Sequence, residues 1–80
     1  MLNHIKHKLE QALPGADIKL IDEDAQHQGH AATGKHLAVT ITYAGFKQMP
    51  LVEQHRMIYK ILDKEMKEQI HALKISTRTP

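Results

Sequence analysis

The chain has 80 residues, which is enough for one domain with a small hydrophobic core. Hydrophobic residues make up 41% of the chain and charged residues 25%, a composition typical of a folded globular protein rather than a disordered one. The formal charge of +2 does not by itself indicate a nucleic-acid partner, and the lack of cysteine excludes disulfides and thiolate metal sites made by this chain alone.

Membrane and secretion signals are missing from the sequence pattern. No apolar run approaches the roughly 18 residues that a membrane-spanning helix needs. The first residues, Met1 to Lys6, also lack the apolar region of a secretory signal peptide. We therefore expect a cytoplasmic protein that does not associate with membranes, or a protein of an organelle matrix if a transit peptide has been removed.

The first predicted element is a helix. Apolar residues recur at helical spacing over residues 2–13, and Pro14 with Gly15 then ends the pattern. His4 and His7 fall outside the apolar stripe, so we expect both side chains to be solvated.

A long loop is predicted between the first two strands. Residues 16–22 alternate well enough for a strand, whereas residues 22–36 have no period and contain two glycines. This loop holds three of the seven histidines, His27, His30 and His36. A connection longer than about 12 residues is uncommon in a compact domain and often carries the function.

The second strand, residues 36–43, gives the clearest pattern in the chain. Alternate residues are apolar and β-branched residues are abundant, which predicts a half-buried strand. Ala44 and Gly45 should turn the chain, and Phe46 should anchor the core. Pro50 suits the first turn of a helix, where its missing N–H has no consequence.

The rest of the chain predicts helix and then strand. Residues 51–69 should be helical, either continuous or broken near Asp63, with an apolar stripe made by Leu51, Val52, Ile58, Tyr59, Leu62 and Met66. His55 lies beside this stripe and should be partly buried and hydrogen-bonded. Residues 72–78 alternate again and predict a third strand.

The order of the elements predicts how the strands pair. The first two strands can pair antiparallel, and a strand that returns after a helical crossover can lie parallel to its neighbour. The second and third strands would then begin at the same end of the sheet. We therefore expect His71 to lie near His36 and the other loop histidines.

Several short motifs occur in the order found in a known family. They are Ile21-Asp22-Glu23, His27, His36 at a strand start, Phe46, Gln54-His55-Arg56-Met57-Ile58-Tyr59, Ile70-His71-Ala72-Leu73 and Thr77-Arg78-Thr79-Pro80. With these motifs the chain resembles the BolA family over nearly its whole length.

This resemblance implies an α/β (α+β) fold of the type II K-homology kind. The order would be αββααβ, with a three-stranded mixed sheet and the helices packed on one face. Proteins of this family are partners of monothiol glutaredoxins, with which they share a [2Fe-2S] cluster in iron-sulfur trafficking or iron regulation.

The resemblance also implies a ligand set. His71 would be one cluster ligand, and the second would be a loop histidine, His27, His30 or His36. The partner and glutathione would supply the sulfur ligands. We expect no cofactor in the chain alone, which would be a monomer or a weak homodimer.

Two positions depart from the family pattern. Asp24 stands where a serine is common, and Gln48 stands where a glycine often follows the phenylalanine. Neither change removes a ligand, but both put the geometry of a turn in question.

Other interpretations of the histidines stay open on spacing alone. The loop histidines could be ordinary solvated residues, with His71 a capping or core residue, or the three loop histidines could form a zinc site. An enzyme is not expected, because no nucleophile has a recognisable neighbourhood and no glycine-rich phosphate loop is present.

The alternative function is that of a DNA-binding transcriptional regulator of stress response and morphology, a role that the family resemblance also includes. Four basic residues could line one face of a continuous helix, namely Arg56, Lys60, Lys64 and Lys67. Acidic residues are interleaved with them, namely Glu53, Asp63, Glu65 and Glu68. Pairs such as Lys64 with Glu68 would make an ordinary solvated face. The Gly-x-x-Gly loop of true K-homology domains is also missing between the helices.

Overall fold

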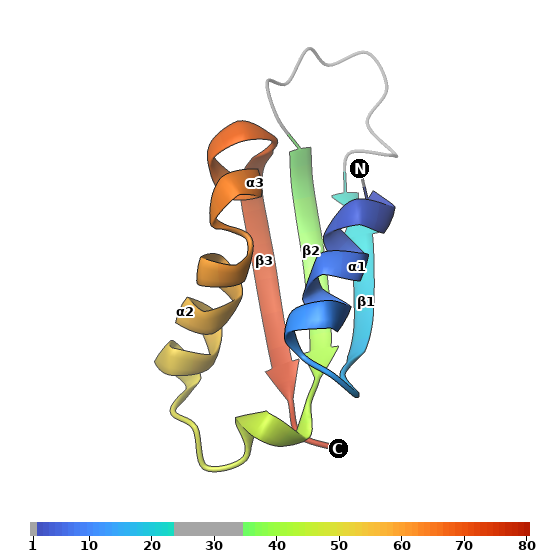
Figure 1. Cartoon of the computed structure of the whole chain (residues 1–80). Helices are drawn as coiled ribbons and strands as arrows, with labels where there is room; N and C mark the ends of the chain where they lie inside the picture. Colours follow the sequence, from blue (N-terminus) through green and yellow to red (C-terminus); the bar gives the residue numbers. More distant parts are fainter. Residues whose placement is uncertain (1, 24–34) are drawn as a thin grey trace.

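The computed structural model describes residues 2–23 and 35–80 (Figure 1). Its elements follow the predicted order: α1 (Leu2–Ala12), β1 (Asp17–Asp22), β2 (Lys35–Thr42), the short 3-10 helix η2 (Ala44–Phe46), α2 (Leu51–Ile61), α3 (Asp63–Glu68) and β3 (Ile70–Arg78). The helix, strand, strand, two helices and strand expected from periodicity are therefore confirmed. Asp24 lies outside the described residues.

The three strands form one mixed sheet in the order β1-β2-β3. β2 pairs antiparallel with β1 and parallel with β3, as predicted. All three α-helices lie on the same face of this sheet (Figure 1). An α+β fold with its helices on one face is thus confirmed.

The core fills the space between the sheet and the helices. Alternate residues of β2, from Leu37 to Ile41, are buried, because successive side chains of a strand point to opposite faces. The buried apolar residues are Ile5, Leu9, Leu13, Ile18, Leu37, Val39, Ile41, Phe46, Ile58, Leu62, Ile70 and Leu73. This set includes Phe46, whose predicted role as a core anchor is confirmed.

The predicted helical segment 51–69 is divided at Leu62. There the backbone has φ −99° and ψ 21°, and the Leu62 N–H donates to the carbonyls of Ile58 and Lys60. Three residues of the predicted apolar stripe, Leu51, Val52 and Tyr59, are exposed instead of buried. The physical reason is that α2 packs against β3, an edge strand of the sheet, so the side of the helix beyond that edge has no strand beneath it. His55 is half-buried, as expected.

The connection from β2 to α2 packs around an aromatic pair. The rings of Tyr43 and Phe46 meet edge to face with their centroids 5.2 Å apart. A Cβ at Gly45 would overlap the Tyr43 ring, so only glycine fits there without displacing that ring.

The backbone between Phe46 and α2 departs from expectation at two residues. Gln48 has φ 66°, in the left-handed region that favours glycine. Pro50 precedes α2 as its N-cap rather than lying within its first turn.

Candidate metal-binding site

The predicted meeting of His36 and His71 is confirmed. β2 and β3 run parallel and begin at the same end of the sheet, where His36 and His71 lie. Their ring centroids are 5.1 Å apart and the ring planes meet at 85°. His27 and His30, the other two predicted ligands, lie outside the described residues.

An irregularity in strand pairing gives His71 its position. Lys35 pairs with Ile70, but His36 pairs with Ala72, so His71 is an extra residue with no partner in the ladder. Such a bulge bends the strand and turns a side chain in a new direction. β3 therefore begins at Ile70, two residues before the predicted start, because the bulge interrupts the alternation on which the prediction relied.

The end of α3 is hydrogen-bonded to this bulge. The backbone N–H of Lys35 donates to the carbonyl of Gln69 at 3.0 Å, and the N–H of Gln69 donates to the carbonyl of Glu65 at 2.8 Å. Gln69 thus closes the last turn of α3 and also joins β2 immediately before His36. A shift of α3 would therefore also shift the strand residues next to the two histidines.

Ion pairs surround the same end of the sheet. Lys35 Nζ lies 3.2 Å from Asp22 Oδ2, and Lys74 Nζ lies 3.4 Å from Glu23 Oε2. The first pair joins β1 to β2, and the second joins the residue after β1 to β3. Both pairs lie at the surface, so each contributes at most about 1 kcal/mol, and they link the end of β1 to the other two strands.

Geometry and ligand chemistry test whether a metal centre fits these residues. Imidazole nitrogens bind a tetrahedral metal at ~2.0–2.1 Å, so two histidines that share one metal must lie side by side. His36 and His71, with ring centroids 5.1 Å apart in edge-to-face contact, meet that requirement of proximity. Within residues 2–23 and 35–80 no group of three or more candidate ligands is assembled. With no cysteine in the chain, thiolate ligands must come from another molecule.

Glu65 is the charged residue that the sequence analysis misjudged. It was expected on a solvated face, yet its side chain is only 2% exposed. Lys8 Nζ donates to Glu65 Oε1 at 2.8 Å and to Oε2 at 3.1 Å, and His4 Nε2 lies 3.0 Å from Oε2. His4 remains exposed as predicted, but it is also a partner of this carboxylate.

Two opposing effects set the pKa of Glu65. Burial raises it, whereas hydrogen bonds from Lys8, from the backbone of Glu65 and from His4, together with the charge of Lys8, lower it. The balance holds the pKa below its ordinary value, so the carboxylate is charged at neutral pH. A sequence signal existed, because Glu65 lies seven residues after Ile58 and three after Leu62, at helical spacing from two core residues.

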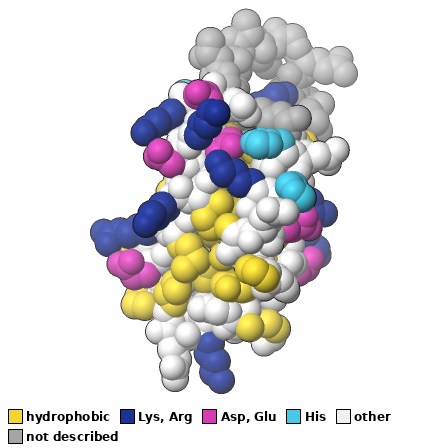
Figure 2. All heavy atoms as spheres, in the orientation of Figure 1, with side chains coloured by type: hydrophobic (Ala, Val, Ile, Leu, Met, Phe, Trp, Pro, Cys, Tyr) yellow, Lys and Arg dark blue, Asp and Glu magenta, His cyan; other side chains and the backbone are white. Residues whose placement is uncertain are grey.

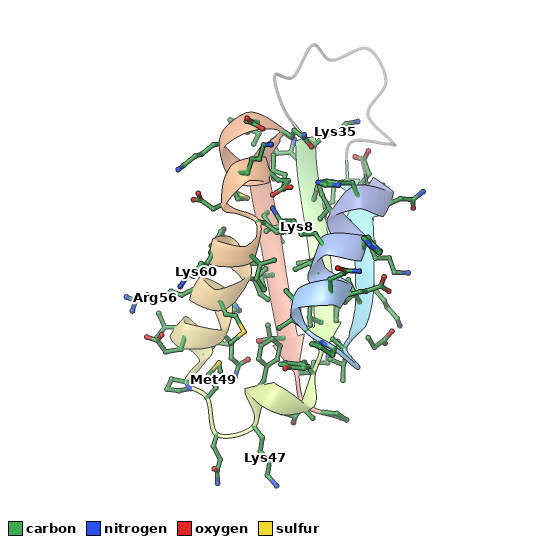
Figure 3. The ribbon with its side chains drawn as sticks, viewed as in Figure 1. Lys8, Lys35, Lys47, Met49, Arg56 and Lys60 are labelled. Atoms are coloured by element: carbon green, nitrogen blue, oxygen red, sulfur yellow. The ribbon has the colours of Figure 1, made fainter. Side chains whose placement is uncertain are left out.

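Charged groups and apolar groups separate on the helix side of the molecule. Figure 2 shows basic, acidic and histidine side chains gathered towards the end where α1 approaches α3. Apolar side chains gather further down, between α1 and α2. The contacts of Glu65 with Lys8 lie in the charged part, where Lys8 extends from α1 towards α3 (Figure 3).

The predicted basic face is not a stripe on a single helix. The break at Leu62 separates Arg56 and Lys60 on α2 from Lys64 and Lys67 beyond it. Arg56 and Lys60 extend away from the body of the molecule (Figure 3).

Acidic neighbours neutralise two of these four basic residues. Arg56 pairs with Glu53 at 3.0 Å, and Lys67 pairs with Asp63 at 3.2 Å. The expected pair of Lys64 with Glu68 is not among the ion pairs of the described residues.

The helices of the described part are short. None of them has the length and apolar character required to cross a bilayer.

Comparisons with known proteins place the chain in a family. The family model described as BolA-like protein matches residues 9–80. The chain is 36% identical to SufE-like protein 1 (chloroplastic/mitochondrial) of Arabidopsis thaliana, covering 95% of the chain and 23% of that protein. It is 34% identical to Protein BOLA1, chloroplastic, of the same plant, covering 98% of the chain and 52% of that protein.

A bacterial relative and two solved structures extend the comparison. The DNA-binding transcriptional regulator BolA of Escherichia coli K12 is 31% identical, with 94% of the chain and 71% of that protein covered. The solved BolA domain of Arabidopsis SufE1 superposes with a TM-score of 0.82 at 36% identity, covering 98% of this chain and 90% of that one. Arabidopsis BolA1 superposes with a TM-score of 0.86 at 32% identity, covering 100% and 92%.

These matches differ in how much of each relative they include. The chain spans about a quarter of the SufE-like protein and about half of BOLA1, but most of both solved domains. The family model covers all but the first eight residues. The chain therefore belongs to the BolA-like family.

Proposed function

We propose that this protein binds a monothiol glutaredoxin and contributes two histidines to a [2Fe-2S] cluster that bridges the two proteins. His71 is one ligand, and the second is His27, His30 or His36. The contact between His36 and His71, with ring centroids 5.1 Å apart, is the observation that carries the proposal. The order of the elements predicted this proximity, and the parallel pairing of β2 and β3 provides its structural basis.

Ligand chemistry explains why a partner is required. A cluster needs four ligands, and this chain offers imidazoles but no thiolate. A partner cysteine and the thiol of glutathione complete the set in this proposal. When bound, the cluster supplies iron and sulfide as cargo, at a potential that neutral nitrogen ligands raise.

Mixing the protein with cluster-bearing, glutathione-loaded monothiol glutaredoxin tests the proposal. The visible absorption and circular dichroism of the cluster should change as histidine replaces a ligand. His71→Ala should abolish that change, and so should alanine at whichever of His27, His30 and His36 is the second ligand. Because imidazolium cannot bind iron, acidification should oppose assembly in the wild type.

His7→Ala is the matched control, since His7 is an exposed histidine on α1. It should give the wild-type spectrum. A wild-type spectrum that stays that of glutaredoxin alone, or a full response from His71→Ala, would contradict the proposal.

DNA binding is the second candidate function. Two observations favour it: the E. coli relative is named as a DNA-binding regulator, and Lys60 and Lys64 are exposed. The affinity for a DNA duplex should then fall steeply with salt, and neutralising both lysines should lower the salt slope by about 2. Arg56→Gln should have less effect than Lys60→Gln, because Arg56 is already paired with Glu53. A flat salt dependence would exclude this candidate.

The cellular location is a separate matter from both candidates. Two relatives are named as chloroplastic or chloroplastic/mitochondrial proteins. The expected cytoplasmic location stays a prediction, which localisation of the tagged full-length protein would test.

A further inference from the structure

We infer that Glu65 is a positioning residue for the imidazole pair. Its contacts with α1 hold α3 in place, and the end of α3 holds the bulge that sets His71 against His36. The inference rests on the proposed function only for its consequence, cluster ligation. The geometry itself is a property of the protein without a cluster.

The contacts of Glu65 form a bridge between two helices far apart in sequence. Lys8 and His4 lie four residues apart on α1, so both side chains project from the same face of that helix. They engage both carboxylate oxygens of Glu65, with distances of 2.8 to 3.1 Å. Hydrogen bonds to charged groups are shorter and stronger than those between neutral groups. Because the contacts involve both carboxylate oxygens and come from two residues of α1, this clamp restricts the orientation of Glu65 as well as its distance from α1.

α3 depends on such a clamp. It has only six residues, and its N-cap residue, Leu62, makes no side-chain capping hydrogen bond. A helix of this length does not hold itself in water, because the cost of nucleation exceeds the gain from its few hydrogen bonds. Glu65 is its one buried residue among those described. Met66 of α3 also packs, partly buried, against the core, and α3 contacts β3. Glu65 supplies the polar contacts that fix how α3 is oriented towards α1.

Two backbone hydrogen bonds connect Glu65 to the residue that precedes His36. The carbonyl of Glu65 accepts the N–H of Gln69, and the carbonyl of Gln69 accepts the N–H of Lys35. Lys35 is the first residue of β2, it pairs with Ile70 before the register shift, and His36 follows it directly. If the last turn of α3 moved or frayed, the bond to Lys35 would be lost and His71 could slide into the ladder opposite His36.

A glutamate at this position is not explained by stability alone. Replacing a buried ion pair by apolar side chains of similar size is often neutral or stabilising. Apolar contacts, however, have no fixed direction, whereas the clamp joins particular oxygens to Lys8 and His4. The charged carboxylate of Glu65 can therefore orient α3, and through α3 the imidazole pair, which apolar packing would not do.

NMR of the cluster-free protein tests the inference directly. Glu65→Gln keeps the shape of the side chain and removes its charge. The cross-relaxation signal between the ring protons of His36 and His71 should be lost, and both sets of ring shifts should move towards those of an exposed histidine. Amide exchange at Lys35 should become at least about tenfold faster relative to the amides in the middle of β2, which report global unfolding.

Two further variants separate positioning from general destabilisation. Glu68→Gln removes the same charge from the same helix at an exposed site and should leave the ring contact intact. Lys8→Met removes the main partner of Glu65 from the other helix, where the lysine side chain is 36% exposed and more tolerant of change. It should weaken the ring contact in the same way, and it serves as the decisive variant if Glu65→Gln does not fold.

The same samples distinguish this inference from the proposed function. Folded Glu65→Gln and Lys8→Met proteins that both retain the ring contact and the protection of Lys35 would overturn the inference, even if wild type forms the bridging cluster. If wild type forms no cluster but the two variants lose the contact, the proposed function fails and the positioning role stands. If wild type does form the cluster, both variants should show a smaller spectral change than Glu68→Gln.

Discussion

The two ends of the sheet are built on different principles. One end, which we term the turn end, comprises residues 43–50, where backbone hydrogen bonds close the turns and the buried centre is the apolar and aromatic packing around Phe46. The opposite end, the histidine end, comprises residues 35 and 36 with residues 65–71. There Ile70 packs into the core, hydrogen bonds join the end of α3 to β2, and a charged group, Glu65, is buried with its polar partners.

This difference separates stability from function. Apolar burial is non-directional and contributes most of the free energy of folding, so it suits the turn end, which stabilises the fold and positions no proposed ligand. Ligand positioning needs directional contacts, which contribute less net stability because each polar group also loses its hydration. Substitutions at the turn end should therefore change the free energy of unfolding, and substitutions at the histidine end should change geometry.

The largest expected effect is at Phe46. Phe46→Ala should lower the free energy of unfolding by about 3–5 kcal/mol, because it removes a fully buried ring and leaves a cavity. That loss is a large share of the total stability of a small domain, so Phe46→Leu, expected to cost about 1 kcal/mol, is the variant for quantitative work. Urea denaturation followed by circular dichroism measures both.

An exposed leucine near the turn end provides the control for Phe46. Leu51→Ala removes an exposed leucine near the turn end and should stay within about 0.5 kcal/mol of wild type. Folded Phe46→Leu should keep the contact between the rings of His36 and His71. Loss of that contact would show that the two ends are not independent.

The next effect is the pH dependence from Glu65. Its pKa in the folded protein is lowered from the ordinary value of 4.5, so its stabilising effect is complete above that value. The effect is lost as the pH falls through the lowered pKa. Glu65→Gln should cost about 1–3 kcal/mol at neutral pH, and this difference from wild type should shrink as the pH falls below 4.5.

Denaturation of both proteins across this pH range checks the prediction. Other carboxylates titrate in both proteins, so the informative quantity is the difference between them. Glu68→Gln, at an exposed site on the same helix, should follow wild type closely. A difference that is constant down to pH ~2 would show that the carboxylate has no lowered pKa.

The smallest effect concerns the backbone of the turn end. Gln48 has a positive φ of 66°, which costs a residue with a Cβ roughly 1 kcal/mol. Gln48→Gly should therefore raise the free energy of unfolding by a few tenths to about 1 kcal/mol, since glycine also gains freedom in the unfolded chain. Gln48→Ala keeps the Cβ and should show no such gain in the same denaturation experiment. Equal stability of the two variants would contradict this explanation.

Much of the fold was predictable because it follows from local patterns. Alternation in β2 and the helical spacing in α1 depend on residues a few positions apart, and the structure confirms both. The meeting of His36 with His71 was predictable for a related reason: a crossover between parallel strands places their starts at one end.

The bulge and the clamp were not predictable in this way. The extra residue at His71 depends on where α3 ends, and the burial of Glu65 depends on Lys8, which lies 57 residues away. Within its own segment Glu65 has helical spacing from Ile58 and Leu62, but it also follows Lys64 directly, in a run of charged residues typical of a solvated face. Only the approach of α1 makes burial of its charge favourable.

By itself, the sequence determined the order of the elements, the buried face of β2 and the end of the sheet where His36 and His71 lie, because periodicity and chain connectivity act locally. Only the tertiary structure decided how the helix breaks at Leu62, which charge is buried and how His71 faces His36. Those features arise where side chains distant in sequence compete for the same space and the same hydrogen bonds, and such competition exists only once the helices lie on the sheet.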